Sequence, residues 1–372
     1  MKLLVINWRD LKHPLAGGAE AHIQNITSRL VSEFGHDVTF ISNSHGGMLP
    51  SRERYDNLDL IRFGNEYNFN YLVMLKLKGI INDFKPDLIV EDVNKIPFYI
   101  PAYTSVPVML VIPHLFSETI FKQANVIIAS YVYFAEKLMY PIYKKCHVHV
   151  ISNSTKDDLA QKGYKYDDIS VAECGIDHSF YIPGNRKSER PTVCYTGRVK
   201  KYKSIDHLIK AAEILKRDIP DIRIVIIGQD DYLSELRLLS EKLGLSDNIE
   251  FPGYISHHDK IKLLQESHCL AYTSIKEGWG ISNIEANGCG TPVVASNVPG
   301  LKDSVVDGES GLLYEYGNID ELAGKIKLIL TNTALRKKLE EGALKWASKF
   351  TWDRTARLFN QVLEERYPGI YS

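Results

Sequence analysis

Glycines and backbone amides between positions 273 and 296 could bind a phosphate group. An apolar run at 269–273 precedes a glycine-containing loop, and the pattern predicts a helix that begins near Gly280 or Ile281. The amides of Gly280, Ile281 and Ser282 would then lack partners within the helix and could donate to phosphate oxygens. The helix dipole would add about 0.3–1 kcal/mol to that interaction.

Two acidic residues lie on either side of this expected helix start. Glu277 stands in the loop before it, and Glu285 stands about one turn inside the helix. Carboxylates are poor phosphate ligands, but they accept hydrogen bonds from the hydroxyl groups of a sugar or a ribose. The alternative interpretation is that both acids only stabilise a helix N-terminus, which needs no ligand.

Two cationic residues follow the first strand expected in the second half of the chain. Arg198 and Lys203 lie in the segment Thr-Gly-Arg-Val-Lys-Lys-Tyr-Lys-Ser, at a strand's carboxyl end. Arginine offers a planar fork of donors and lysine a compact charge, and both suit a diphosphate. The alternative is solvated surface charge, which is our interpretation of Lys200 and Lys201.

Residues of the first half could also reach a ligand. Gly17 and Gly18 lie between an expected strand and a helix, where the backbone can approach an anion, although a plain tight turn would look the same. This segment is neither a Gly-x-Gly-x-x-Gly motif nor a P-loop. His114 ends an apolar strand and could donate to a sugar hydroxyl or share a proton. A capping histidine is the alternative.

Short runs rich in Val and Ile alternate with longer amphipathic stretches and would position these residues. The expected strands are 3–7, 38–42, 87–90, 108–112, 126–129, 148–152, 192–195, 223–228, 249–251, 269–273, 292–295 and 311–314. Nearly continuous apolar character is typical of parallel strands covered on both faces. We therefore expect an α/β fold with two Rossmann-like, doubly wound parallel-sheet domains.

The expected domains are 1–175 and 190–350, followed by a C-terminal helix over 351–372 that packs back on the first domain. The linker around 173–191 is polar, with Ile-Pro-Gly-Asn-Arg-Lys-Ser-Glu-Arg-Pro at 182–191. Ligands of open α/β sheets bind at the carboxyl ends of the strands. Two such sheets facing a deep cleft would line it with the loops described above.

Composition excludes several classes of protein. The 372 residues include 45 Lys and Arg against 46 Asp and Glu, which argues against nucleic-acid binding through bulk charge. No apolar run approaches the roughly 18–20 residues of a membrane span, and the first apolar run is too short for a signal peptide. Five scattered cysteines without a Cys-x-x-Cys motif indicate free thiols. We therefore expect a cytoplasmic protein.

Possible metal ligands occur only in pairs. The pairs are His147 with His149, His257 with His258, Asp157 with Asp158, and Asp230 with Asp231. No third ligand is marked, so we expect the histidines at the surface. No Asp-x-Asp motif stands in a strand-end loop to hold a divalent ion, and we predict that no metal or other cofactor is required.

Taken together, these motifs resemble a glycosyltransferase of the GT-B fold, in the large retaining family 4 (glycosyl transferases group 1). The resemblance is carried by Glu277-x7-Glu285 within Glu-Gly-Trp-Gly…Glu-Ala…Gly-Thr-Pro-Val-Val-Ala, by Gly197-Arg198…Lys203, by Gly17-Gly18-Ala19-Glu20 and by Gly175-Ile176-Asp177. It departs from the family pattern at Cys174, at Asn287-Gly288, and at Ser204, where a glycine is frequent.

The resemblance implies that these residues bind a nucleotide-sugar donor. Arg198 and Lys203 would bind its diphosphate, Glu285 the ribose hydroxyls and Glu277 the transferred sugar, with His114 near the reacting face of that sugar. The implied donor-binding residues are Gly17, Gly18, Arg198, Lys203, Glu277, Gly278, Trp279, Gly280, Ile281, Ser282 and Glu285. The implied catalytic residues are His114, Arg198, Lys203 and Glu277.

The resemblance also implies transfer with retained anomeric configuration. No carboxylate is clearly placed as the nucleophile of the usual retaining scheme, so a front-face displacement is implied, in which the leaving phosphate helps to take the acceptor proton. The donor would be a UDP- or GDP-sugar and the acceptor a glycan or lipid-linked hydroxyl. The alternatives are a sugar-nucleotide epimerase or hydrolase of the same fold, and a non-catalytic nucleotide-sugar-binding subunit.

The acceptor is expected against the first domain, in a segment rich in aromatic residues. Residues 96–145 contain Phe98, Tyr99, Tyr103, Phe116, Phe121, Tyr131, Tyr133, Phe134, Tyr140 and Tyr143. Aromatic residues near Lys144 and Lys145 suit peripheral contact with a membrane, on its cytosolic face. Packing of helices on the sheet would use aromatic residues as well, and that interpretation stays open.

Overall fold

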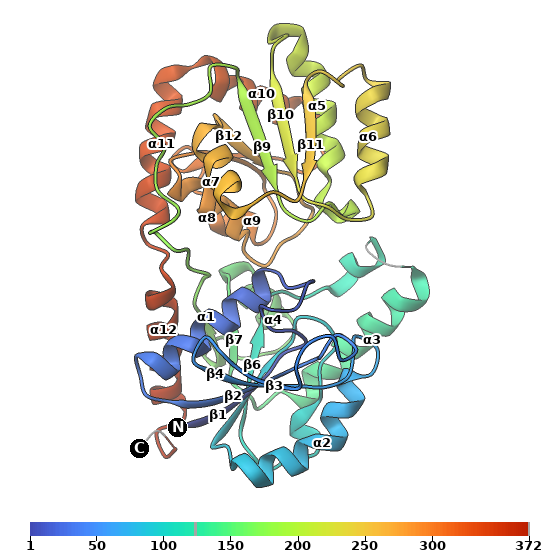
Figure 1. Ribbon diagram of the computed structural model, residues 1–372, viewed down its shortest axis with the longest axis vertical. Helices are drawn as coiled ribbons and strands as arrows, with labels where there is room; N and C mark the ends of the chain where they lie inside the picture. The colour runs from blue at the N-terminus through green and yellow to red at the C-terminus, as the bar shows by residue number, and fades with distance from the viewer. Residues whose placement is uncertain (123–124, 371–372) are drawn as a thin grey trace. The chain divides into compact units, whose positions relative to one another are not determined.

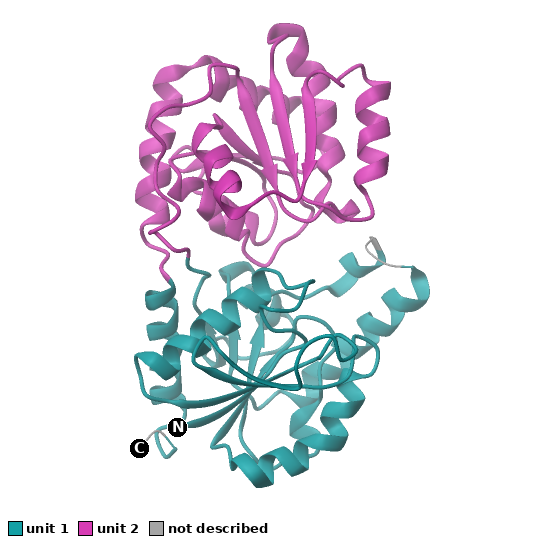
Figure 2. Cartoon of the chain, viewed as in Figure 1, with its two compact units in different colours: residues 1–175, 352–372 teal, residues 176–351 magenta. Residues whose placement is uncertain are grey.

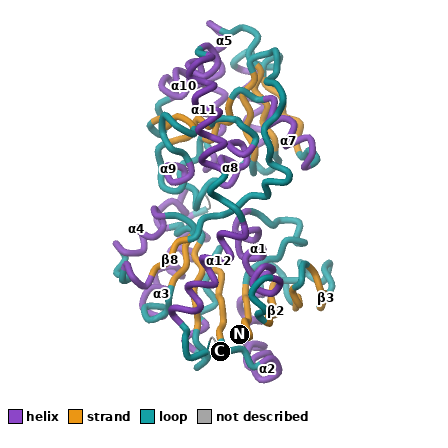
Figure 3. The backbone as a smooth tube through the Cα atoms, turned by 90° about the vertical axis from the view of Figure 1, so that its left-hand side faces the viewer, coloured by secondary structure: helices purple, strands orange, loops and turns teal. Residues whose placement is uncertain are grey.

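The computed structural model describes residues 1–122 and 125–370. The chain forms two compact units (Figure 2): unit 1 comprises Met1–Gly175 with Trp352–Ser372, and unit 2 comprises Ile176–Thr351. Each unit is an open sheet with helices on both of its faces, as Figure 3 shows. The expected α/β fold with two parallel-sheet domains is confirmed.

Unit 1 is built on an eight-stranded sheet in the order β3-β4-β2-β1-β5-β6-β7-β8 (Figure 1). The edge strand β3 is antiparallel to β4, and the other neighbours are parallel. The strands are β1 (Lys2–Ile6), β2 (Asp37–Ser42), β3 (Arg52–Tyr55), β4 (Leu58–Arg62), β5 (Leu88–Asp92), β6 (Val108–Ile112), β7 (Val148–Val150) and β8 (Ile169–Val171). The helices are α1 (Gly18–Ser32), α2 (Phe69–Phe84), α3 (Val126–Ile142), α4 (Asn153–Gln161) and α12 (Trp352–Arg366).

Strand β1 is apolar at every position from Leu3 to Ile6, and the structure shows why. Leu4 and Ile6 pack in the cluster that includes Phe69 of α2. Leu3 and Val5 pack in a second cluster with helices α1 and α12. Since successive side chains of a strand point to opposite faces, a sheet that is covered on both faces needs apolar residues at every position.

The C-terminal helix α12 is part of the core of unit 1. Phe359 and Leu363 are fully buried beside Leu3 and Val5. Polar contacts add to this packing: His36 Nε2 lies 2.7 Å from Asn360 Oδ1, and Arg29 pairs with Asp353 at 2.7 Å. The chain therefore leaves unit 1 at Gly175 and completes its hydrophobic core only after residue 351.

Unit 2 is built on a six-stranded, wholly parallel sheet in the order β11-β10-β9-β12-β13-β14. Its strands are β9 (Thr192–Thr196), β10 (Arg223–Ile227), β11 (Ile249–Gly253), β12 (Cys269–Tyr272), β13 (Val293–Ser296) and β14 (Gly311–Tyr314). Its helices are α5 (Ile205–Asp218), α6 (Leu233–Lys242), α7 (His257–Glu266), α8 (Ile281–Gly288), α9 (Leu301–Ser304), α10 (Ile319–Thr331) and α11 (Thr333–Ala347). Strand order reverses between β9 and β12, so their carboxyl ends form a switch point where α/β proteins bind ligands.

Three expectations from the sequence need correction: one strand is a helix, some strands were missed, and two histidines expected at the surface are buried. Residues 126–129 begin α3, whose first turn is capped by Asn125 Oδ1 accepting from the Ile128 amide at 3.0 Å. Strands β3, β4 and β8 were missed. His147 and His149 are buried, not at the surface, and His147 Nε2 and His149 Nδ1 lie 2.9 and 3.0 Å from Ser170 Oγ.

The structure also bears on the expectations for the cysteines and for membrane spans. All five cysteines are free, and only Cys146 is more than marginally exposed. Among the helices in the described part of the chain, none combines the length and the apolar character needed to cross a membrane.

Candidate functional site

The loop after β9 begins with a backbone crossing that only glycine permits. Gly197 has φ 151°, and a Cβ on Gly228 would lie 1.8 Å from the Gly197 carbonyl oxygen. The loop then presents Arg198 to solvent, and the buried Tyr195 hydroxyl donates to the Arg198 carbonyl at 3.0 Å. Arg198 is therefore an exposed cation on a backbone that is fixed from within the core.

Lys203 lies at the end of the 3₁₀ turn η4 (Lys201–Lys203), directly before α5. The residue is only 5% exposed, and its ammonium group donates to the Tyr272 hydroxyl at 3.0 Å and pairs with Glu277. Burial opposes the charge on Lys203, but the Glu277 carboxylate and the neighbouring tyrosines together outweigh burial and hold the pKa of Lys203 well above its usual value. Lys203 is therefore a permanently charged group inside the protein.

The loop after β12 places Glu277 next to this cation. The Glu277 amide donates to the Pro299 carbonyl at 3.3 Å, and a Cβ on Gly300 would lie only 2.1 Å from the Glu277 carbonyl oxygen. Gly300 has φ 83°, a conformation that side chains other than glycine rarely adopt. Close backbone packing therefore fixes Glu277. Without a ligand, Glu277 and Lys203 neutralise each other.

Helix α8 begins where the sequence predicted, and no side chain caps its first turn. Gly280 is the N-cap residue with φ 88°, and a Cβ there would come within 2.8 Å of Leu301 Cδ2. Ile281 and Ser282 are half-buried. Helix-terminal amides without a side-chain cap are available to an anion. Trp279 is buried, with its ring centroid 5.2 Å from that of Phe350, and it holds this loop from the inside.

Glu285 has two partners that sequence reasoning missed. The Tyr181 hydroxyl donates to Glu285 Oε1 at 2.6 Å, and Lys260 Nζ lies 2.7 Å from Oε2. His257 Nε2 lies 3.1 Å from the same Tyr181 hydroxyl. These residues come from the linker and from α7, so no local spacing could have indicated them. Each carboxylate oxygen keeps a lone pair for a further donor such as a ribose hydroxyl.

Unit 2 thus gathers its predicted site residues at one edge of the sheet. The loops that carry Arg198, Lys203 and Glu277 follow β9 and β12, which are neighbouring parallel strands. The start of α8 continues the second of these loops. The arrangement combines cations and free amides for a diphosphate with carboxylates for hydroxyl groups.

Ser204 stands where a glycine is frequent in the resembled family, and its backbone conformation is strained. Ser204 adopts φ 49°, in the left-handed region, between η4 and α5. Glycine adopts this conformation without strain, whereas the Cβ of serine makes it unfavourable. The Ser204 hydroxyl lies 2.9 Å from the Tyr316 hydroxyl. This contact helps to hold the strained residue in place.

The predicted residues of unit 1 also lie at the carboxyl ends of its strands. Gly17 is the N-cap residue of α1, and its amide donates to Glu20 Oε2 at 2.8 Å. Gly18 is exposed in the first turn of that helix. His114 follows β6, is half-buried, and lies with its ring centroid 4.8 Å from that of Phe116. Asn94 Nδ2 donates to Glu20 Oε1 at 3.1 Å, which ties the loop after β5 to the start of α1.

Two buried acids end β5 in the same unit. Burial raises the pKa of Glu91 to about 7, although the Tyr143 hydroxyl donates to it at 2.6 Å and the Phe98 amide at 2.7 Å. Burial also holds the pKa of Asp92 well above its usual range, and the charge on Glu20 adds to this effect. Glu91 therefore anchors the loop after β5, and the environment of Asp92 favours its protonated form.

One cluster of possible metal ligands escaped the sequence analysis. His13 Nε2 and His45 Nδ1 lie 3.0 and 2.8 Å from Glu66 Oε1, in loops that follow β1, β2 and β4. The Leu15 amide donates to His13 Nδ1 at 3.1 Å, so in neutral His13 the proton is on Nε2. A metal-bound histidine normally donates from its second nitrogen. The donor set therefore fits a hydrogen-bonded trio better than a metal site.

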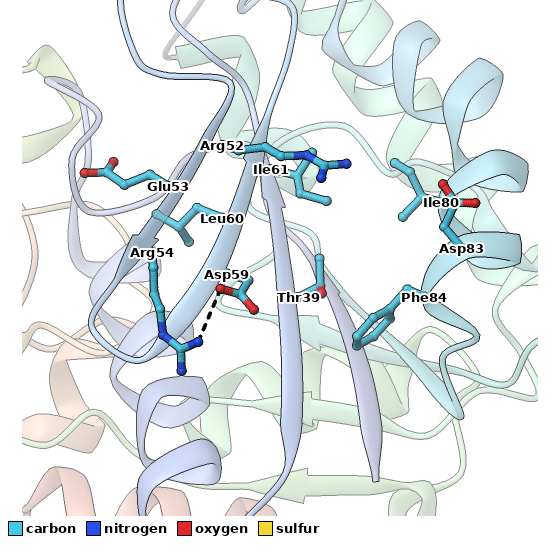
Figure 4. A pocket seen from close by; sticks show the side chains of 10 residues that line it. All are labelled: Thr39, Arg52, Glu53, Arg54, Asp59, Leu60, Ile61, Ile80, Asp83 and Phe84. Carbon is cyan, nitrogen blue, oxygen red and sulfur yellow. Dashed lines mark ion pairs between the residues drawn. The ribbon is translucent and has the colours of Figure 1, made fainter.

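A cavity of about 540 Å³ lies elsewhere in unit 1 (Figure 4). Residues of β2, β3 and β4 and the last turn of α2 line it, and Arg54 pairs with Asp59 at 3.8 Å on its wall. Its lining shares no residue with the strand-end loops described above.

The sequence is similar to curated glycosyltransferases. The D-inositol 3-phosphate glycosyltransferase of Stackebrandtia nassauensis is 29% identical over 208 residues, which are 51% of this chain and 47% of that protein. The protein of the same name from Mycolicibacterium smegmatis is 31% identical over 204 residues, which are 50% of this chain and 45% of that one. The chain spans about half the length of the curated relatives that it matches.

Solved structures share the fold over nearly the whole chain. Sucrose-phosphate synthase from Thermosynechococcus elongatus has a TM-score of 0.84 at 20% identity and covers 99% of both chains. HepE from Anabaena, solved in complex with UDP and glucose, has a TM-score of 0.77 at 19% identity and covers 98% of this chain and 100% of its own. With the two parallel-sheet units, this likeness shows that the chain has the GT-B fold.

Family comparison covers the two halves of the chain separately. Residues 16–180 match the family described as Glycosyltransferase Family 4. Residues 181–346 match the family described as Glycosyl transferases group 1. Together with the GT-B fold, these matches show that the chain belongs to the group 1 glycosyltransferases.

Proposed function

We propose that this protein transfers a sugar from a nucleoside diphosphate donor, UDP- or GDP-linked, to a hydroxyl group of a glycan or lipid-linked acceptor. The proposal is carried by the common edge in unit 2 at which Arg198, Lys203 and the uncapped start of α8 meet. Cleavage of the bond to the sugar leaves a diphosphate with growing negative charge. Preorganised cations and amides stabilise that charge, and such groups often supply the largest single catalytic effect.

The Lys203–Glu277 pair suggests how donor binding would begin. In the ligand-free protein each charge neutralises the other. A diphosphate would compete for the ammonium group of Lys203, and Glu277 would then be free to accept hydrogen bonds from the sugar. Glu285, which is held by Tyr181 and Lys260, would accept from the ribose. His114 would contact the sugar from unit 1.

Retention of configuration and independence from metal are part of the same proposal. The cationic groups in unit 2 would take the place of a divalent ion at the diphosphate, so a chelator such as EDTA should leave the transfer rate unchanged. Loss of activity that magnesium restores would contradict this. The front-face displacement would use a phosphate oxygen of the leaving group to receive the acceptor proton.

Incubation of the purified chain with UDP- and GDP-hexoses, with and without lipid-linked and glycan acceptors, tests the proposal. Anomeric proton couplings in the NMR spectrum should show a new glycosidic linkage with the donor's configuration. Release of free sugar alone would indicate a hydrolase, and an isomerised sugar would indicate an epimerase. Binding without any reaction would indicate a non-catalytic subunit.

We also propose peripheral contact with the cytosolic face of a membrane, through α3. The helix exposes Val126, Ile127, Ile128, Tyr131, Phe134 and Leu138, with Ile127 79% and Phe134 66% exposed. Lys144 and Lys145 follow the helix and are exposed too. Apolar side chains beside lysines suit an anionic lipid surface. Five free cysteines are typical of a reducing compartment.

The aromatic segment 96–145 contributes to this proposed contact only in part. Phe98 and Tyr143 are buried in the core, whereas Tyr103 and Phe121 are exposed. Gln123 and Ala124 of that segment lie outside the described residues. The proposed contact therefore rests on α3 and not on the whole segment.

Sedimentation with phosphatidylglycerol vesicles and with phosphatidylcholine vesicles tests the membrane contact. We expect the wild type to bind the anionic vesicles and the double variant Ile127→Ser, Phe134→Ser to lose most of that binding. The matched control is Leu238→Ser on α6, where a 65% exposed leucine is replaced in unit 2. Equal binding by the double variant and the control would contradict the proposal.

A further inference from the structure

Two buried tyrosines lie side by side beneath the cationic loops of unit 2. Tyr195 is in β9 and Tyr272 ends the neighbouring strand β12. Their rings are stacked, with centroids 5.5 Å apart and an angle of 21° between the planes. Both hydroxyls lie at the start of the loop after β9, since a Cβ on Gly197 would be 3.1 Å from the first and 3.5 Å from the second.

Each hydroxyl holds one of the two cationic segments. Tyr195 donates to the Arg198 carbonyl, and Tyr272 accepts from Lys203 Nζ, both at 3.0 Å. Thr273, the residue after Tyr272, donates from its own hydroxyl to the Lys203 carbonyl at 2.9 Å. The end of β12 therefore fixes both the backbone and the side chain of Lys203.

The bond to Tyr272 is different in kind from the ion pair with Glu277. Burial raises the pKa of Tyr272 to about 12, so its phenol is neutral at physiological pH. A neutral acceptor orients an ammonium group without neutralising it, whereas a carboxylate competes with any anionic ligand for the same charge. The Tyr272 hydroxyl also keeps its own proton, for which the described residues provide no acceptor.

We propose that Tyr272, supported by stacking on Tyr195, is a positioning residue that holds the Lys203 ammonium group in place when a diphosphate displaces it from Glu277. This inference rests on the proposed function, because it assumes that Lys203 binds the donor's diphosphate. It assigns a role to a residue that no motif in the sequence indicates. A side chain at this position is otherwise expected only to fill the core.

The variant Tyr272→Phe removes the hydroxyl and keeps the ring. Its matched control is Tyr314→Phe in β14 of the same sheet. Tyr314 is also buried, and its hydroxyl has no partner among the described residues. Loss of a buried hydroxyl is thus common to both variants, and only Tyr272→Phe releases Lys203.

The first measurement needs no nucleotide and does not depend on the proposed function. The purified full-length chain is acetylated with a limiting active ester, and the labelling rate of each lysine is read by mass spectrometry. We expect Lys203 to react at least about threefold faster in Tyr272→Phe than in the wild type and in Tyr314→Phe, because an ammonium group loses a hydrogen bond. The exposed Lys242 serves as the internal reference. An unchanged Lys203 rate overturns the inference.

The second measurement is the affinity for UDP and for GDP by isothermal titration. For whichever nucleotide the wild type binds, Tyr272→Phe should bind about tenfold more weakly, and Tyr314→Phe should bind as the wild type does. Equal weakening in both variants, or none in Tyr272→Phe, overturns the inference. If the wild type binds neither nucleotide, the proposed function fails, and the labelling result alone decides whether Tyr272 positions Lys203.

Discussion

At the scale of single residues, Lys203 is a buried and charged lysine. Its ammonium group is neutralised by the Glu277 carboxylate, which an anionic ligand could replace. Lys203 is 5% exposed and pairs with Glu277, whose side chain is 14% exposed. A buried ion pair is costly to form and is weak evidence for a purely stabilising role. Its position at the sheet's carboxyl edge is explained better by binding than by stability.

Replacement of Lys203 by alanine should lower turnover by about 100-fold or more, since one preorganised charge donor is lost. The melting temperature should fall as well, because Glu277 is left partly buried without its partner. Steady-state kinetics and thermal unfolding measure the two effects. The control is Lys200→Ala, three residues away, where a half-buried side chain pairs with Asp230 and Asp231 at 2.7 and 2.8 Å. Turnover of both variants within a few-fold of wild type would contradict the role of Lys203.

Glu91 supplies a test at the same scale in unit 1. Its pKa of about 7 in the folded protein exceeds the value near 4.5 expected for an exposed glutamate. The folded state therefore binds more protons between these values, and stability is lost as pH rises from about 4.5 to 7. Relative to Glu91→Gln, the wild-type free energy of unfolding should fall by about 3 kcal/mol across this range. Urea unfolding measures this free energy for both proteins. The same pH dependence in the wild type and in Glu91→Gln would contradict the prediction.

At the scale of elements, the sequence predicted the strands well where both faces of the sheet are covered. Residues 108–112 and 311–314 match β6 and β14, because continuous apolar runs occur where both faces are buried. The same rule misassigned 126–129, whose β-branched residues start α3 and are largely exposed. An exposed apolar run cannot be distinguished from a buried strand by local pattern alone. The polar edge strand β3 carries no such signal at all.

The site could be predicted in part for a similar reason. Loops directly after strands meet at one edge of a parallel sheet, so Arg198, Lys203 and Glu277 could be grouped from the order of elements. Tyr181 and Lys260 could not, because they reach Glu285 from 104 and 25 positions away in the chain. Contacts between residues so far apart leave no spacing for a sequence argument to use.

The loop that carries Glu277 packs against Gly300, the residue before α9, and this contact gives a prediction at the scale of elements. Gly300→Ala should disturb Glu277, since its Cβ would lie 2.1 Å from the Glu277 carbonyl oxygen. The matched control is Gly308→Ala: Gly308 has a similar φ of 75°, but a Cβ there meets nothing within 4 Å. Both variants carry backbone strain, because both glycines have a positive φ that other residues rarely adopt. Only Gly300→Ala should also weaken donor binding, measured as the affinity for UDP or GDP by isothermal titration. Equal affinities of the two variants would contradict the proposed role of the contact between Gly300 and Glu277.

At the scale of the whole molecule, each unit presents its own half of the candidate machinery at the carboxyl ends of its strands. Unit 2 carries the cations and the helix start, and unit 1 carries Gly17, Gly18 and His114. The two chain crossings between units lie next to each other, since the Ile176 amide donates to the Phe350 carbonyl at 3.1 Å. This division agrees with the separate family matches of 16–180 and 181–346.

The central claim is that the edge of unit 2 binds a nucleoside diphosphate through its cations. Isothermal titration of the full chain with UDP and with GDP, for the wild type, Arg198→Ala and Arg217→Ala, tests it most directly. Arg217 is exposed at the end of α5 and serves as the control. We predict that at least one nucleotide binds the wild type with a 1:1 stoichiometry. Arg198→Ala should then bind it about tenfold more weakly or worse, and Arg217→Ala as the wild type does. No binding of either nucleotide, or equal affinity in all three proteins, would contradict the account.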